Sequence, residues 1–77
     1  MAQYISVVAR FTEDGQVLPL SFTWPDGRTF AIDRILDVCQ AASRKQGGCG
    51  TRYLCRVRHR TIALFREDTR WFYELQP

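Results

Sequence analysis

The stretch GGCGTRYLCRVRHR, residues 47–60, holds the densest group of side chains in this sequence that could do chemistry. It contains two of the three cysteines, the only histidine and four arginines, and it has no acidic residue. Cysteine thiolates and histidine are zinc ligands, and arginine binds phosphate through its forked donors. The stretch is therefore a candidate metal site, a candidate phosphate-binding surface, or one solvated face of a strand.

The three cysteines and the histidine are enough in number for a zinc site, but their spacing is unlike one. They follow the pattern Cys39-x9-Cys49-x5-Cys55-x3-His59, whereas structural zinc sites present two cysteines within a few residues of each other. On an alternating strand Cys55 points inward, where a free cysteine behaves as a small hydrophobic residue. We expect neither a metal nor another cofactor, and the sequence assigns no role to the three thiols.

No arrangement of residues in the chain predicts an enzyme. Lys45 precedes the glycines of 47–50, the reverse of a P-loop, in which lysine follows the last glycine at the start of a helix. His59 has an arginine on each side and no carboxylate to orient it as a base. A thiol beside arginines, Cys49 or Cys55, could have a lowered pKa, but no base partner accompanies it. We predict a binding module that is not an enzyme, and we identify no small-molecule substrate.

The arginines of 52–60 alternate with apolar residues and form the strongest candidate site. Side chains two apart on a strand face the same way at intervals of about 6.6 Å, which would line the arginines up. Residues 38–66 carry seven bases and no acid, whereas the other four bases and eight acids give a charge of −4. This pattern predicts weak, sequence-tolerant nucleic-acid binding. The residues predicted to bind nucleic acid are Arg44, Lys45, Arg52, Arg56, Arg58 and Arg60.

Two aromatic residues are predicted to point outward, Phe72 in the last strand and Tyr4 in the first. Exposed rings can stack on unpaired bases. They can also form a dimer interface, which is a common way to complete a small core. The leading hypothesis from the sequence is an interaction module that binds a protein partner or a second copy of itself, and nucleic-acid binding is the alternative.

Period-two alternation of apolar residues predicts strands along most of the chain. The Asp-Gly steps at 14–15 and 26–27 predict tight hairpin turns, because glycine accepts positive φ. The clearest predicted strands are 3–12, 17–24, 51–58, 61–66 and 70–75. The residues predicted to face the core are Ile5, Val7, Ala9, Phe11, Leu18, Leu20, Phe22, Trp24, Tyr53, Cys55, Val57, Trp71, Tyr73 and Leu75.

The segment from Phe30 onward fits two patterns, and the choice between them decides the fold class. As a strand through about Val38, it places Leu36 and Val38 inward and leaves Ile35 exposed. As a helix over 33–46, it has an apolar stripe, a capping Asp33 and glycines at its end. The β-branched content favours the strand, and the helix stays open as the alternative.

We therefore predict an all-β fold, a single small domain over residues 1–77 with about six strands in a small barrel or a strongly bent antiparallel sheet. The alternative is an α+β fold with one helix around residues 33–46. An odd number of cysteines, no signal-peptide pattern and no apolar run of about 18 residues lead us to expect a soluble cytoplasmic protein without a membrane segment.

Several distinct short motifs follow one another along the chain. A DG hairpin precedes Phe22-x-Trp24-x-x-Gly27-Arg28-x-Phe30-x-Ile32, which is followed by a glycine-rich Arg-Tyr step at 48–53, by Leu64-Phe65 and by Trp71-Phe72. In this order they resemble a group of short uncharacterised bacterial proteins that form small β domains of unknown function. The resemblance implies a compact β domain, and it implies no activity.

Overall fold

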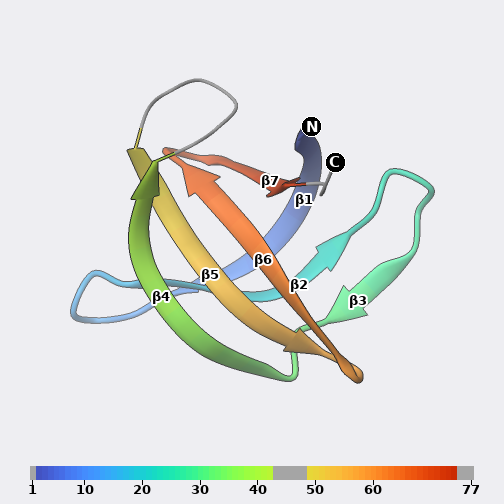
Figure 1. Cartoon of the computed structure of the whole chain (residues 1–77). Coiled ribbons are helices and arrows are strands. Elements are labelled where there is room, and N and C mark those ends of the chain that lie inside the picture. Colours follow the sequence, from blue (N-terminus) through green and yellow to red (C-terminus); the bar gives the residue numbers. More distant parts are fainter. Residues whose placement is uncertain (1, 43–48, 75–77) are drawn as a thin grey trace.

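The computed structural model describes residues 2–42 and 49–74, which form one antiparallel sheet that curls into a half-barrel (Figure 1). The strands are β1 (Ala2–Phe11), β2 (Val17–Thr23), β3 (Thr29–Ala31), β4 (Arg34–Ala42), β5 (Cys49–Val57), β6 (Arg60–Glu67) and β7 (Arg70–Glu74). Their order across the sheet is β3-β2-β1-β7-β6-β5-β4. The predicted all-β fold is confirmed, with seven strands in place of about six.

The extra strand arises because the predicted strand over 30–38 is divided at Ile32 and Asp33. The Ile32 N–H donates to the Leu20 carbonyl on β2, and the next N–H, of Asp33, donates to the Arg56 carbonyl on β5 (both 2.9 Å). β3 and β4 lie at opposite edges of the sheet, so two residues span the distance between these edges. The sheet must curl for this connection to be made.

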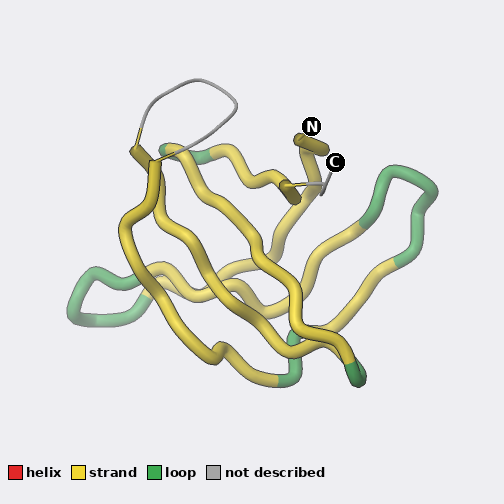
Figure 2. Tube along the Cα trace, viewed as in Figure 1, coloured by secondary structure: helices red, strands yellow, loops and turns green. Residues whose placement is uncertain are grey.

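The helix alternative for 33–46 is wrong over the described part of that segment, because residues 34–42 form β4. Residues 43–46 lie outside the described residues. Figure 2 shows that strand makes up most of the described chain, with turns confined to the connections. Nowhere in the described ranges is there a helix long and apolar enough to cross a membrane.

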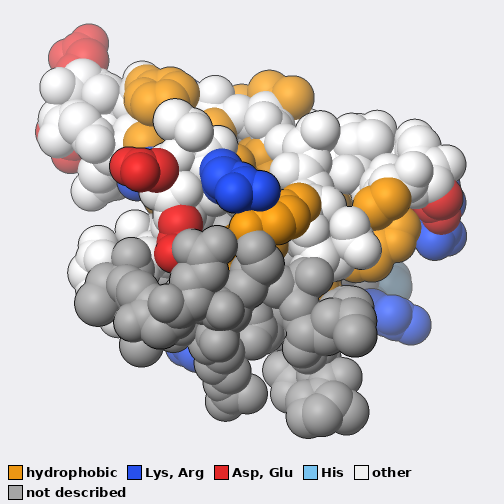
Figure 3. Space-filling model, turned by 90° about the horizontal axis from the view of Figure 1, so that it is seen from above, with side chains coloured by type: hydrophobic (Ala, Val, Ile, Leu, Met, Phe, Trp, Pro, Cys, Tyr) orange, Lys and Arg blue, Asp and Glu red, His pale blue; other side chains and the backbone are white. Residues whose placement is uncertain are grey.

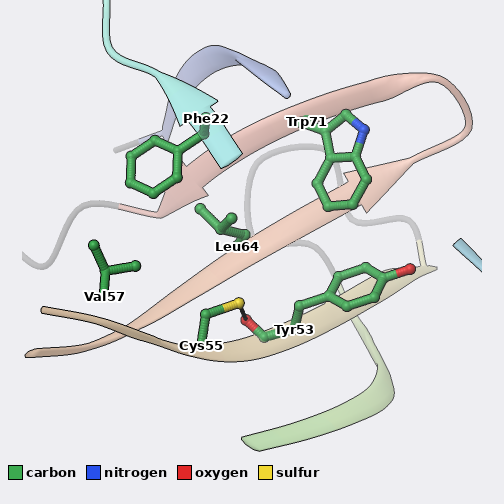
Figure 4. Packing of buried hydrophobic residues seen from close by; sticks show 6 residues of the cluster. All are labelled: Phe22, Tyr53, Cys55, Val57, Leu64 and Trp71. Atoms are coloured by element: carbon green, nitrogen blue, oxygen red, sulfur yellow. Dashed lines mark hydrogen bonds between the residues drawn. The ribbon is translucent and has the colours of Figure 1, made fainter. Parts of the chain in front are cut away.

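The core fills the concave face of the curled sheet (Figure 4). Its buried side chains come from four strands, β2, β5, β6 and β7. They are Phe22, Tyr53, Cys55, Val57, Leu64 and Trp71. Across this core, the Tyr53 hydroxyl on β5 donates a 2.5 Å hydrogen bond to the Val17 carbonyl on β2. One tyrosine therefore joins two strands that are not neighbours in the sheet.

Two β-bulges overturn part of the predicted inward pattern. The register moves from Val8 opposite Ser21 to Ala9 opposite Pro19, which leaves Leu20 as the extra residue of β2. As a result Pro19 is buried and Leu20 is exposed. A bulge adds one residue to one strand, so every side chain beyond it changes face.

The second bulge lies in β4, where Ile35 is opposite Cys55 and Asp37 is opposite Leu54. Leu36 is the extra residue and is 41% exposed, while Ile35 is partly buried. The prediction had these two residues reversed. Val38 pairs with the core residue Tyr53 but is exposed, because β4 is the edge of the sheet. Phe11, also predicted to face the core, is 78% exposed at the end of β1.

We predict that Tyr53→Phe lowers the free energy of unfolding by about 1 kcal/mol or more, since it leaves the Val17 carbonyl without its partner and keeps the packed ring. Urea denaturation monitored by fluorescence measures the change. Tyr73→Phe is the matched control, because the Tyr73 hydroxyl has no hydrogen bond within the described residues. Equal stability of Tyr53→Phe and the parent protein would contradict the proposed role of this bond.

Candidate functional site

One end of the half-barrel contains a pocket of about 610 Å³ lined by aromatic and basic side chains. This volume is within the usual range for small-molecule sites. Three arginines and the histidine line it, and none of its lining residues is acidic. The lining residues are Phe22, Trp24, Arg28, Phe30, Val57, Arg58, His59, Arg60, Ile62 and Tyr73. In Figure 3, basic side chains and the histidine lie beside hydrophobic side chains at one end of the molecule.

Phe30 is the centre of the basic side of this pocket. The guanidinium carbons of Arg28 and Arg58 lie 5.7 Å and 5.4 Å from the centre of its ring, within the range of a cation–π contact. Phe30 also stacks on the core residue Phe22, with ring centres 5.4 Å apart. Two arginines are therefore held against a ring that is itself fixed by the core.

The β2–β3 hairpin positions Arg28. Gly27 adopts a φ of 94°, and its N–H donates to the Trp24 carbonyl at 2.9 Å, closing the predicted Asp-Gly turn. The Asp26 carboxylate accepts hydrogen bonds from the Arg28 backbone N–H at 3.0 Å and from Nε at 2.7 Å. The backbone hydrogen bond is the main reason why the pKa of Asp26 is below its usual value. Asp26 therefore stays ionised and keeps Arg28 beside Phe30.

The β5–β6 hairpin positions Arg58 and Arg60. Arg58 begins the two-residue turn with a φ of 57°, a conformation that is costly for residues other than glycine. Its N–H donates to Asp33 Oδ2 at 2.8 Å, while the Asp33 N–H donates to the Arg56 carbonyl at 2.9 Å. These two bonds attach the hairpin to the connection between β3 and β4 (Figure 1).

Trp24 and Tyr73 form the aromatic side of the pocket. Their rings meet edge to face, with centres 5.4 Å apart and planes at 88°, and both are partly exposed. Exposed ring faces can stack on a flat ligand, and arginines nearby can bind its charge. The pocket thus combines an aromatic surface with a cationic one, which suits a ligand that carries both a planar ring and an anionic group.

The arginines predicted to form one line are divided between the two faces of the sheet. Arg56 is on the outer face, opposite Thr61, and Arg52 is on the same face, opposite Phe65. Arg58 and Arg60 line the pocket instead. The alternation ends at Val57, which pairs with Arg60 across the turn, so Arg60 shares the core-facing side with Val57. Arg44 and Lys45 lie outside the described residues.

The prediction that Phe72 presents an exposed ring is wrong. It does point to the face opposite Trp71, but it is 0% exposed. Its ring stacks on Phe65 at 5.4 Å and meets the edge of Tyr4 at 6.0 Å. Tyr4 is partly buried, and the Arg70 guanidinium carbon lies 4.0 Å from the centre of its ring. Phe72 is therefore not the stacking surface that the sequence suggested, and the Tyr4 ring already has Arg70 against it.

The described thiols lie on opposite faces of the sheet. Cys39 is opposite Arg52 on the outer face, whereas Cys55 lies in the core with Tyr53 and Val57. The Cys55 thiol is directed to the Tyr53 carbonyl at 3.6 Å (Figure 4). Burial raises the pKa of Cys55 to about 11, so the suggestion that arginines lower the pKa of this thiol is wrong. The cause is desolvation, which disfavours the charged thiolate.

Sequence reasoning missed the residues that make the pocket a site: Trp24, Arg28, Phe30 and Tyr73. The signal was present in the motif Phe-x-Trp-x-x-Gly-Arg-x-Phe, which the resemblance singled out only as a structural pattern. The hairpin register places Phe22 directly opposite Phe30, which brings the two ends of this motif together. Tyr73 could not be added from the sequence, because it reaches the pocket only through the curl of the sheet.

Comparisons with known proteins do not assign the pocket to a known family. No protein family, curated protein or solved structure matches the chain. The resemblance to short bacterial β domains therefore stays a prediction.

We predict that Cys55 resists alkylation in the folded protein and that Cys39 reacts before it. With a pKa of about 11, only about one Cys55 in a thousand is a thiolate at a pH near 8, and the side chain is buried besides. Iodoacetamide treatment followed by peptide mapping measures both sites, and the same reaction in urea is the control. Rapid labelling of Cys55 under native conditions would contradict the buried position.

Proposed function

We propose that this domain binds single-stranded nucleic acid, with one base in the aromatic side of the pocket and the adjoining phosphate on its arginines. The observation that carries the proposal is the placement of Arg28 and Arg58 against Phe30 in the same pocket as the partly exposed rings of Trp24 and Tyr73. A nucleotide has both a planar ring and an anion. It therefore matches both sides of the pocket.

The geometry favours a single strand over a duplex. A base can stack on Trp24 or Tyr73 only when its face is free, and the bases of a duplex are stacked on one another. The contacts are with ring faces and with phosphate, which every nucleotide has. The proposed binding is therefore tolerant of sequence, as the arginine-rich composition suggests.

The sharpest test of the pocket is Arg58→Gly. Glycine adopts positive φ without strain, so we expect a free energy of unfolding within about 1 kcal/mol of the parent value, while affinity for an oligonucleotide falls about tenfold with the loss of a charged contact. Fluorescence anisotropy with a labelled single strand measures the affinity. Asp68→Gly is the matched control, because Asp68 has the same φ of 57° in the β6–β7 turn and does not line the pocket.

Salt dependence and a duplex probe complete this test. The logarithm of the affinity should fall with the logarithm of salt concentration, and the phosphate bound by the pocket's arginines should contribute about −0.7 to the slope for a single strand. A duplex of the same sequence should bind more weakly. Absence of binding to the single strand at about 50 mM salt, or an equal loss of affinity in Arg58→Gly and Asp68→Gly, would contradict the proposal.

A second candidate function is self-association through β4, which is an edge strand with Leu36 and Val38 exposed on it. An unpaired edge offers a row of backbone donors and acceptors to another strand. An antiparallel pair of β4 strands could also place Arg34 of one copy near Asp37 of the other, which gives the contact charge complementarity. The dimer interface predicted around Phe72 does not apply, because that ring is buried.

If β4 is a dimer interface, light scattering should give twice the chain mass, and Val38→Lys should return it to the mass of one chain. A lysine on an edge strand opposes pairing with another edge. Val8→Lys is the control, because Val8 is 62% exposed on β1, which has a partner strand on each side. A parent protein that is monomeric at all concentrations would exclude this candidate.

A further inference from the structure

A pair of arginines outside the pocket stands directly opposite each other on the outer face of the sheet. Arg34 of β4 is in register with Arg56 of β5, and both are exposed. Side chains at such positions have Cβ atoms about 5 Å apart, and like charges there are destabilising. A pair of this kind is unfavourable for folding unless an anion lies between the two guanidinium groups.

The protein supplies no such anion within residues 2–42 and 49–74. The ion pair found there is between Arg28 and Asp26, and neither Arg34 nor Arg56 takes part in it. Asp37 is a diagonal neighbour, opposite Leu54, and it makes no ion pair with either arginine. Asp33 is nearby, but its carboxylate accepts the Arg58 backbone N–H. The two guanidinium groups are thus available to an external anion.

The arginine pair is held at the same end of the sheet as the pocket. Asp33 precedes Arg34 in the chain and makes two hydrogen bonds at the end of β5. Its N–H donates to the Arg56 carbonyl, and its carboxylate accepts from the Arg58 N–H. Arg56 and Arg58 are separated by Val57 alone. The arginine pair therefore lies on the outer face of the sheet and the pocket on its concave face. Arg58, in the β5–β6 turn, lies between them.

We propose that Arg34 and Arg56 together bind a second phosphate of the strand whose base occupies the pocket. The strand passes from the pocket, over Arg58 at the turn, to the outer face. This inference rests on the proposed nucleic-acid function and adds a direction and a minimum length to it. The domain then recognises a run of nucleotides, and a free mononucleotide occupies the pocket side alone.

The test compares thymidine 5′-monophosphate with oligothymidylates of about two, four and eight nucleotides, using the full chain. We expect affinity to rise about tenfold between the mononucleotide and about four nucleotides, since a second charged contact is added. Arg34→Gln/Arg56→Gln should abolish that rise, leave mononucleotide affinity unchanged, and make the salt slope for the longer strand shallower by about 0.7. Arg10→Gln/Arg70→Gln removes the same charge from exposed positions elsewhere and is the control.

The outcomes separate this inference from the function on which it rests. The inference is wrong if affinity does not rise from the mononucleotide to the longer strands, or if the rise survives Arg34→Gln/Arg56→Gln. In both cases the proposed binding of a nucleotide in the pocket still stands. An equal loss in the control variant attributes the effect to net charge and also overturns it. If neither the mononucleotide nor any strand binds, the proposed function and the inference both fail.

Discussion

The structure depends on the curl of one small sheet, which encloses the main core on its concave face. With seven strands and no described second layer, the main apolar cluster is buried because the sheet curls until its concave residues meet. On the outer face, Phe72 is buried against Phe65 and Tyr4. Two features fix the curl: the two-residue connection between β3 and β4, and the Tyr53 hydroxyl bonded to Val17 across the core. The pocket is a consequence of this curl, because it brings Trp24 and Arg28 of the β2–β3 hairpin together with Tyr73 of β7.

The same constraint determines where the positive charge can act. A strand whose core side carries Tyr53, Cys55 and Val57 must place Arg56 on the other side. Only the turn allows an arginine to leave this alternation, and Arg58 does so at the cost of a positive φ. The result is a basic region that continues around the turn of the β5–β6 hairpin, from a concave pocket to an outer arginine pair, with Asp33 bonded to Arg56 and to Arg58.

Much of the fold could be predicted from local pattern, and the errors have a common physical cause. The alternation in β1, β2 and β5 and the two Asp-Gly turns were sufficient for an antiparallel sheet. The inward and outward assignments of Leu20, Ile35 and Leu36 failed because each lies at a bulge, and a bulge reverses a period-two pattern without changing composition. The prediction that Phe72 is exposed failed for another reason. Alternation gave its face correctly but could not show that Phe65 and Tyr4 pack against it.

The sequence by itself determined the strand-forming pattern, the turn positions and the concentration of arginine between residues 38 and 66, because these follow from side-chain size, backbone freedom and charge over a few neighbouring residues. Only the tertiary structure decided which arginines share a surface. Arg28 meets Arg58 across Phe30, and Arg34 meets Arg56 across two strands. These contacts join residues far apart in the chain, and the curl and the register that create them are set by the packing of the whole sheet.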